Sequence, residues 1–252
     1  MLTDPWFYAA AIPAVLLFGI AKGGFGGAFG IMAVPVMSLV ISPVQAAGIL
    51  LPILCLMDLM GLWVYRGKWV WAELRILLPA SLLGITVGTL LFGYLSVAGV
   101  RLIVGTIALL FALHYWYHRQ VTGSERLPEL PQVAGLAGGA AAGFTSFIAH
   151  AGGPPISMYL LRRPLDKTGF VATTVVFFAV VNYVKLVPYA WLGQLSADNL
   201  TASLVLAPFA PLGIALGVWL HNKVTDRQFF RFAYSLLFVV SVKLISDGIS
   251  GL

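Results

Sequence analysis

The chain has 252 residues, of which 60% are hydrophobic and only 10% are charged, and its net charge is +6. Soluble globular domains are about 45–50% apolar and about 25% charged. A chain of this length has too little interior to hide the surplus of apolar side chains from water. The composition therefore excludes an ordinary soluble enzyme, a disordered protein and a nucleic-acid-binding protein. It indicates a protein that crosses a membrane several times.

Apolar runs follow one another along the whole chain, with short polar interruptions between them. Several reach the roughly 20 residues that a helix needs to cross a bilayer, and they lack the alternating polarity of membrane β-barrel strands. We therefore predict an all-α polytopic membrane protein with ten apolar segments. They cover residues 6–21, 29–41, 44–65, 74–95, 98–118, 132–148, 154–162, 169–192, 199–220 and 229–249.

The second half of the chain repeats landmarks of the first half. The first two segments of each half are short and are separated by a glycine-rich joint. Ordered matches at a nearly constant offset indicate an internal duplication, so we predict a first repeat at residues 1–118, a linker at 119–131 and a second repeat at 132–252. A shift of about 126 residues aligns Gly26 with Gly152, Gly27 with Gly153 and Gly67 with Gly193, and a slightly larger shift aligns Gly84 with Gly213 and Gly88 with Gly217.

The basic residues predict how the segments are oriented. Five segments per half is an odd number, so the halves are expected to form inverted-topology repeats. Cytoplasmic loops carry an excess of Lys and Arg, so we expect a cytoplasmic linker, both termini outside and a bacterial inner-membrane location. The same sidedness holds if each short pair is a re-entrant hairpin and six segments cross, and both arrangements stay open. The basic residues on the cytoplasmic side are Arg66, Lys68, Arg75, Arg119, Arg126, Arg162, Arg163, Lys167, Lys223, Arg227 and Arg231, against Arg101 on the other side.

The two glycine-rich joints are the first candidates for a binding site. Inverted repeats with interrupted helices are typical of transporters, whose substrate site lies where the interrupted segments meet. A helix that begins inside the bilayer presents free N–H groups and the positive end of its dipole, which favour an anion. We predict that Gly24, Gly26, Gly27, Gly152 and Gly153 frame this site. The alternative is that these glycines serve close helix packing.

Ionisable residues inside apolar runs are the second set of candidates, because burying them in a membrane is costly. Lys22 opens the first joint and His150 opens the second. We expect Lys22 to attract an anion and His150 to bind an oxyanion or carry a proton, the alternatives being a snorkelling lysine and a structural histidine. Asp58 and Lys185 lie at nearly equivalent depths in repeat-related segments, and we predict that they form an ion pair.

The glycine-rich joints resemble known sequence signatures. The stretch from Lys22 to Pro35 resembles the first signature of the sulfite exporter TauE/SafE family of membrane transporters, and the stretch from His150 to Ile156 resembles the second. Asn182 with Lys185 also resembles the family's second-half pattern, which adds both to the expected substrate-binding residues. The resemblance implies transport of a small sulfur-containing anion, such as sulfite, thiosulfate or an organosulfonate like sulfoacetate. The chain departs from the pattern at Ala28-Phe29 and Pro154-Pro155, which leaves the identity of the anion open.

We therefore expect a secondary transporter that works by alternating access between its halves. A passive anion channel is the main alternative, and a membrane-embedded enzyme is the weaker one, because the four histidines are scattered and there is a single cysteine. No P-loop, cofactor site or metal site is expected. The expected partners are the anion, the lipid bilayer and, as a further hypothesis, protons as the coupling ion. A homo-oligomer is compatible with the sequence.

Overall fold

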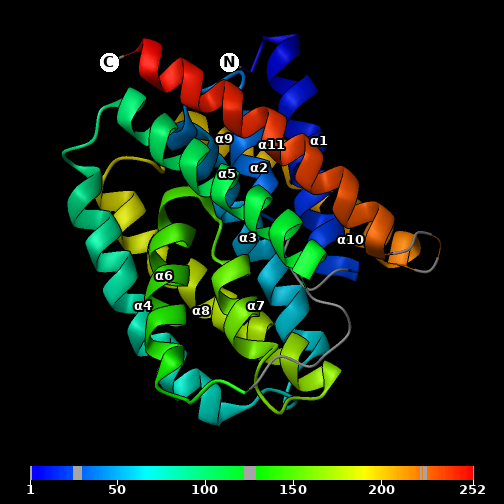
Figure 1. The fold of residues 1–252 in the computed structure, drawn as a ribbon. Coiled ribbons are helices and arrows are strands. Elements are labelled where there is room, and N and C mark those ends of the chain that lie inside the picture. The colour runs from blue at the N-terminus through cyan, green and yellow to red at the C-terminus, as the bar shows by residue number, and fades with distance from the viewer. Residues whose placement is uncertain (1, 25–29, 122–128, 222, 224–225, 252) are drawn as a thin grey trace.

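The chain folds into a bundle of helices. The computed structural model describes residues 2–24, 30–121, 129–221, 223 and 226–251, and within these ranges the regular secondary structure is entirely helical (Figure 1). The all-α prediction is therefore confirmed. The elements are α1 (Pro5–Gly24), η1 (Gly30–Met32), α2 (Ala33–Met37), α3 (Pro43–Val64), α4 (Trp71–Phe92), α5 (Val97–Val121), α6 (Ala134–Ala149), α7 (Gly153–Leu160), α8 (Lys167–Trp191), α9 (Ala197–Leu206), α10 (Phe209–His221) and α11 (Asp226–Ser250).

Local sequence signals explain where the two central helices begin. The Ser42 hydroxyl accepts a hydrogen bond from the Gln45 N–H at the start of α3, and the Asp166 carboxylate accepts one from the Gly169 N–H at the start of α8. Both are N-cap bonds, which satisfy N–H groups that have no partner inside the helix. Pro43 is the first residue of α3, a position that favours proline because an N–H there would have no partner inside the helix.

The lengths of the helices agree with a membrane protein. Among the described residues, five helices (α1, α3, α4, α5 and α8) are long and apolar enough to cross a bilayer, and a sixth span results if α9 and α10 are counted together. We predicted one continuous segment for residues 199–220, but the structure bends by 42° between α9 and α10. Pro208 lies at this break, where its ring and missing N–H oppose a continuous helix.

The segments next to the glycine-rich joints differ from one another in length. We expected the first segment of each half to be short, but α1 has 20 residues because its helix continues through Lys22 to Gly24. In contrast, α2 has five residues and α7 has eight. At about 1.5 Å per residue, α7 is only about 12 Å long and cannot cross a hydrocarbon core of about 30 Å. The chain thus has half-length helices after both joints.

Helices from the two sides of the linker pack against one another. The most extensive helix contacts join α4 to α6, α1 to α10 and α5 to α11, and α3 packs against α8 in the centre. Each of these pairs joins one of the helices α1 to α5 to one of the helices α6 to α11. In Figure 1 the start of α1 and the end of α11 lie at the same end of the molecule.

Glycine allows the closest of these approaches, between α4 and α6. A Cβ atom built on Gly84 would lie 2.0 Å from the carbonyl oxygen of Ala140 and 2.6 Å from the amide nitrogen of Phe144. Both are backbone atoms that cannot rotate away, so Gly84→Ala must push the two helices apart. We expect it to destabilise the protein by about 3 kcal/mol, at the upper end for overpacking.

The measurement is the apparent melting temperature of the purified protein in detergent. Gly93→Ala is the matched control, since a Cβ at Gly93 would meet no described atom within 4 Å. Equal melting temperatures for the Gly84→Ala and Gly93→Ala variants would show that α4 and α6 are not held this closely.

Candidate functional site

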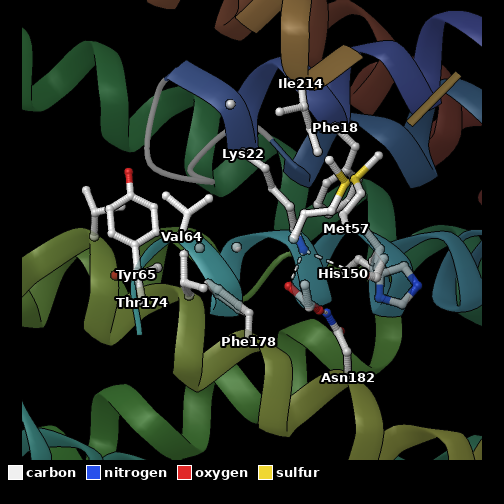
Figure 2. Close-up of a pocket in the computed structure, with 18 of the residues that line it drawn as sticks. Phe18, Lys22, Met57, Val64, Tyr65, His150, Thr174, Phe178, Asn182 and Ile214 are labelled. Atoms are coloured by element: carbon white, nitrogen blue, oxygen red, sulfur yellow. Dashed lines mark hydrogen bonds and ion pairs between the residues drawn. The ribbon is translucent and has the colours of Figure 1, made fainter. Parts of the chain in front are cut away.

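A cavity of about 250 Å³ lies in the middle of the bundle. It is lined by residues of α1, α3, α8 and α10 and by both sides of the α6–α7 break. Most of its wall is apolar. Lys22, His150 and Asn182 lie at one end, which we call the polar end, while Tyr65 and Thr174 lie at the opposite end (Figure 2). Figure 2 shows Lys22 reaching from α1 toward Asn182, with His150 to one side and Tyr65 and Phe178 to the other. The polar lining side chains are Lys22, Asp58, Tyr65, Ser146, His150, Thr174 and Asn182.

Asp58 is the centre of the polar end. One carboxylate oxygen forms an ion pair with the Lys22 ammonium, and the other accepts a hydrogen bond of 2.6 Å from the Asn182 side-chain amide. The Asp58 side chain is 3% exposed and that of Lys22 is 17% exposed. A buried carboxylate needs such partners, because an unpaired ion in the interior costs several kcal/mol. The three side chains therefore form one network that joins α1, α3 and α8.

Lys185 is the centre of a second network. Its ammonium donates to the Ser146 carbonyl at 3.0 Å, to the Ser146 hydroxyl at 2.9 Å and to Nδ1 of His150 at 2.8 Å. Nε2 of His150 lies 3.0 Å from the carbonyl oxygen of Ala47. Because a carbonyl only accepts, Nε2 must carry the hydrogen and Nδ1 must be the acceptor. All three Lys185 hydrogens and both His150 nitrogens are thus engaged by protein groups.

This second network holds the break between α6 and α7. His150 has a φ of 51°, in the left-handed region, and it is the only described non-glycine residue with a positive φ. Such a conformation is unfavourable for a residue with a Cβ, and the bonds of the imidazole ring to α3 and α8 hold it. At Gly152 a Cβ would lie 2.7 Å from the carbonyl oxygen of Ala142, so a side chain does not fit there.

The predicted ion pair between Asp58 and Lys185 is wrong. Of the three described ion pairs, the one made by Asp58 is with Lys22. The physical reason is that Lys22 extends from the last turn of α1 to the Asp58 carboxylate, whereas Lys185 is saturated by Ser146 and His150. The depth of a residue in its segment, which the sequence indicates, does not determine the direction in which its side chain points.

The glycines predicted to frame the site lie in different places. Gly153 lines the cavity, and Gly152 lies in the break beside it. Gly24 is the last residue of α1, while Gly26 and Gly27 lie outside the described residues. Gly23 also lines the cavity, and our sequence analysis did not single it out.

The sequence analysis also missed Ser146. Ser146 precedes His150 by one helical turn, and this spacing on the same face of α6 is the signal that would have found it. The sequence analysis expected no metal site. No group of three His, Cys, Asp or Glu side chains that could hold a metal ion occurs in the described ranges.

A separate buried charge cluster lies outside the cavity, where α4 begins and α7 ends. Glu73 accepts hydrogen bonds from Arg163 Nε at 2.8 Å and from the Tyr159 hydroxyl at 2.6 Å. Arg163 also donates to the carbonyl oxygen of Leu130 at 2.6 Å. The hydrogen bond to Glu73 raises the pKa of the Arg163 guanidinium above its usual value. This cluster ties the end of α7 to α4 and to the residues that lead into α6.

The chain matches a known family of proteins. A family model described as sulfite exporter TauE/SafE covers residues 11–244, nearly the whole chain and both cavity networks. No curated protein and no solved structure matched the chain. The family match agrees with the apolar helices of membrane-spanning length, and it confirms the family resemblance predicted from the sequence. The protein is an integral membrane protein and belongs to the sulfite exporter TauE/SafE family of transporters.

Proposed function

We propose that this protein is a secondary transporter that binds a small sulfur-containing anion at the polar end of its cavity, beside Lys22 and Asn182. The observation that carries the proposal is the charge of this region. Two lysines, Lys22 and Lys185, accompany one carboxylate, that of Asp58. With both lysines protonated and Asp58 ionised, the described groups of the empty site carry one net positive charge in a largely apolar interior, which attracts an anion.

The donors of the cavity suit a sulfur oxyanion or a sulfonate. Such an anion is compact and carries several acceptor oxygens, which match the ammonium of Lys22 and the amide of Asn182. Both side chains line the cavity. Lys185 and His150 take a different role from the one we first assigned to them. We propose that Lys185 and His150 do not contact the anion but fix the backbone at the α6–α7 break, while Lys22 and Asn182 contact the anion.

The pairing of helices supports alternating access between two inverted repeats at residues 1–118 and 132–252. Gly84 and Gly213, which align in the repeat, each lie against the first helix of the opposite half. A Cβ on Gly84 would meet Ala140 of α6, and a Cβ on Gly213 would meet Leu16 of α1 at 2.9 Å. Equivalent positions with equivalent contacts are what a duplication implies. We also propose that both termini lie outside a bacterial inner membrane, which the distribution of basic residues supports.

Binding of sulfur anions by the purified protein tests the proposal. We expect at least one of sulfite, thiosulfate and sulfoacetate to raise the apparent melting temperature in detergent, since a ligand that binds the folded state stabilises it. The same anion should show saturable counterflow in proteoliposomes. Stabilisation by none of the three anions would contradict the proposed substrate class. Flux that does not saturate and shows no counterflow would favour a channel.

Gly153→Leu tests the location of the site in the same assays. Gly153 lines the cavity, so a leucine side chain there would fill space that the anion needs. We expect loss of binding and of counterflow with the protein still folded. Gly93→Leu is the matched control, because a side chain at Gly93 enters open space at the end of α4. Wild-type binding by the Gly153→Leu variant would show that the anion does not bind beside Gly153.

A further inference from the structure

The Asp58 carboxylate occupies the groups that an anion in the cavity would use. Its two oxygens take the ammonium of Lys22 and the side-chain amide of Asn182. Both donors are therefore bound to the same carboxylate, and an anion can reach them only if this carboxylate gives them up. The protein thus contains an internal anion at the place proposed for the substrate, and the substrate has to compete with it.

Displacing an ionised Asp58 would leave it without a partner. Its side chain is 3% exposed, so water does not replace the lost bonds. The next lysine, Lys185, has its three hydrogens on Ser146 and His150. A buried carboxylate without a cation costs several kcal/mol. Taking up a proton removes this cost, and the resulting carboxyl O–H becomes a donor that points to the same region as Lys22.

We propose that Asp58 is the proton-binding group of the transporter, and that it takes up one proton when the anion binds beside Lys22. This inference rests on the proposed function, because it assigns the coupling ion to the same site. The proton is bound on a carboxylate oxygen of Asp58, and the anion takes over the ammonium of Lys22 and the amide of Asn182. Release of the anion lets Asp58 ionise and pair with Lys22 again.

The other titratable groups around Asp58 are less suited to this role. Lys22 faces it from α1, Lys185 and Tyr183 from α8, Cys55 from α3 and His150 from the α6–α7 break. The wall from α10 and α7 is apolar, with Ile214, Val218 and Gly153. Tyrosine and cysteine lose their protons only in the alkaline range. His150 already carries its hydrogen on Nε2, and a second one on Nδ1 would face the Lys185 ammonium.

The sign of the pH dependence follows from linkage. If the anion binds the form with protonated Asp58, then the anion and the proton each raise the affinity for the other. Affinity for the anion should therefore fall by about tenfold per pH unit wherever Asp58 is ionised in the free protein, and should level off at lower pH.

The experiment uses two probe anions, thiosulfate and methanesulfonate, whose own charge does not change near neutral pH. Calorimetric titration of the purified full chain at about pH 6 and about pH 8, in buffers of different ionisation enthalpy, gives the affinity and the number of protons taken up. We expect uptake approaching one proton per anion at the higher pH. The Asp58→Asn variant should bind the anion with little pH dependence and without proton uptake, and Asp58→Glu should restore both.

Asp247→Asn is the matched control, because it makes the same substitution at a surface pair with Lys243. It should keep the proton uptake of the wild type. Binding of a probe without proton uptake, or proton uptake that persists in Asp58→Asn, would overturn this inference and leave the proposed anion site intact. Absence of binding by both probes, by sulfite and by sulfoacetate would overturn the proposed function together with it.

Discussion

The Lys22→Met variant is expected to lose anion binding and to be strongly destabilised. Methionine keeps the length of the side chain but removes the ammonium that lines the cavity and pairs with Asp58. Removal of one member of a buried ion pair leaves the other charge without compensation, and we expect a loss of about 3 kcal/mol. We expect at least a 100-fold loss of affinity, corresponding to about 2.7 kcal/mol. Melting temperature and calorimetric titration provide the measurements.

A double variant separates the two effects of this substitution. In Lys22→Met/Asp58→Asn the uncompensated carboxylate is also removed, so stability should recover toward the wild-type value while binding stays lost. Lys243→Met is the control, since Lys243 is 61% exposed and pairs with Asp247 on the surface of α11. Such an exposed pair contributes little to stability. Wild-type affinity in the folded Lys22→Met variant would show that Lys22 does not contact the anion.

Much of the fold was predictable because the membrane imposes a length on each apolar run. The runs at residues 44–65 and 169–192 became α3 and α8 with ends that differ by one or two residues. The break between α9 and α10 was missed, although Pro208 lies there. Pro79 shows why proline alone is a weak signal, because it lies inside α4, which continues past it.

The residues of the candidate site were predictable as a set, but their partners were not. A lysine or aspartate within an apolar run is visible in the sequence because burying its charge is costly. Which residues touch depends on how each helix is rotated about its axis and how far its side chain extends. Lys22 was assigned to the first joint alone, yet its long side chain reaches Asp58 on α3. Ser146 carries no charge, so its burial is not costly enough to mark it, and only its spacing of one helical turn from His150 points to it.

The Lys185→Met variant should open the break between α6 and α7. Lys185 is fully buried and donates three hydrogen bonds to the end of α6, two to Ser146 and one to His150, where the helix breaks. Methionine fills the same space but leaves these acceptors without a donor in the interior. Each unsatisfied buried group costs about 1–3 kcal/mol, so we expect a loss of about 3 kcal/mol or more. The left-handed conformation of His150 then loses one of the two hydrogen bonds that hold its ring.

Hydrogen–deuterium exchange can locate this effect. Peptides that cover residues 145–155 should exchange faster in Lys185→Met than in the wild type, while peptides from α5 should change little, because local opening exposes amides near the lost bonds first.

A double-mutant cycle gives a second test. The Lys22–Asp58 cycle should show the larger coupling energy and the Lys185–Asp58 cycle the smaller, because the first pair is in contact and the second is not bonded. If the Lys185–Asp58 coupling were the larger, the assignment of Lys22 as the partner of Asp58 would be contradicted.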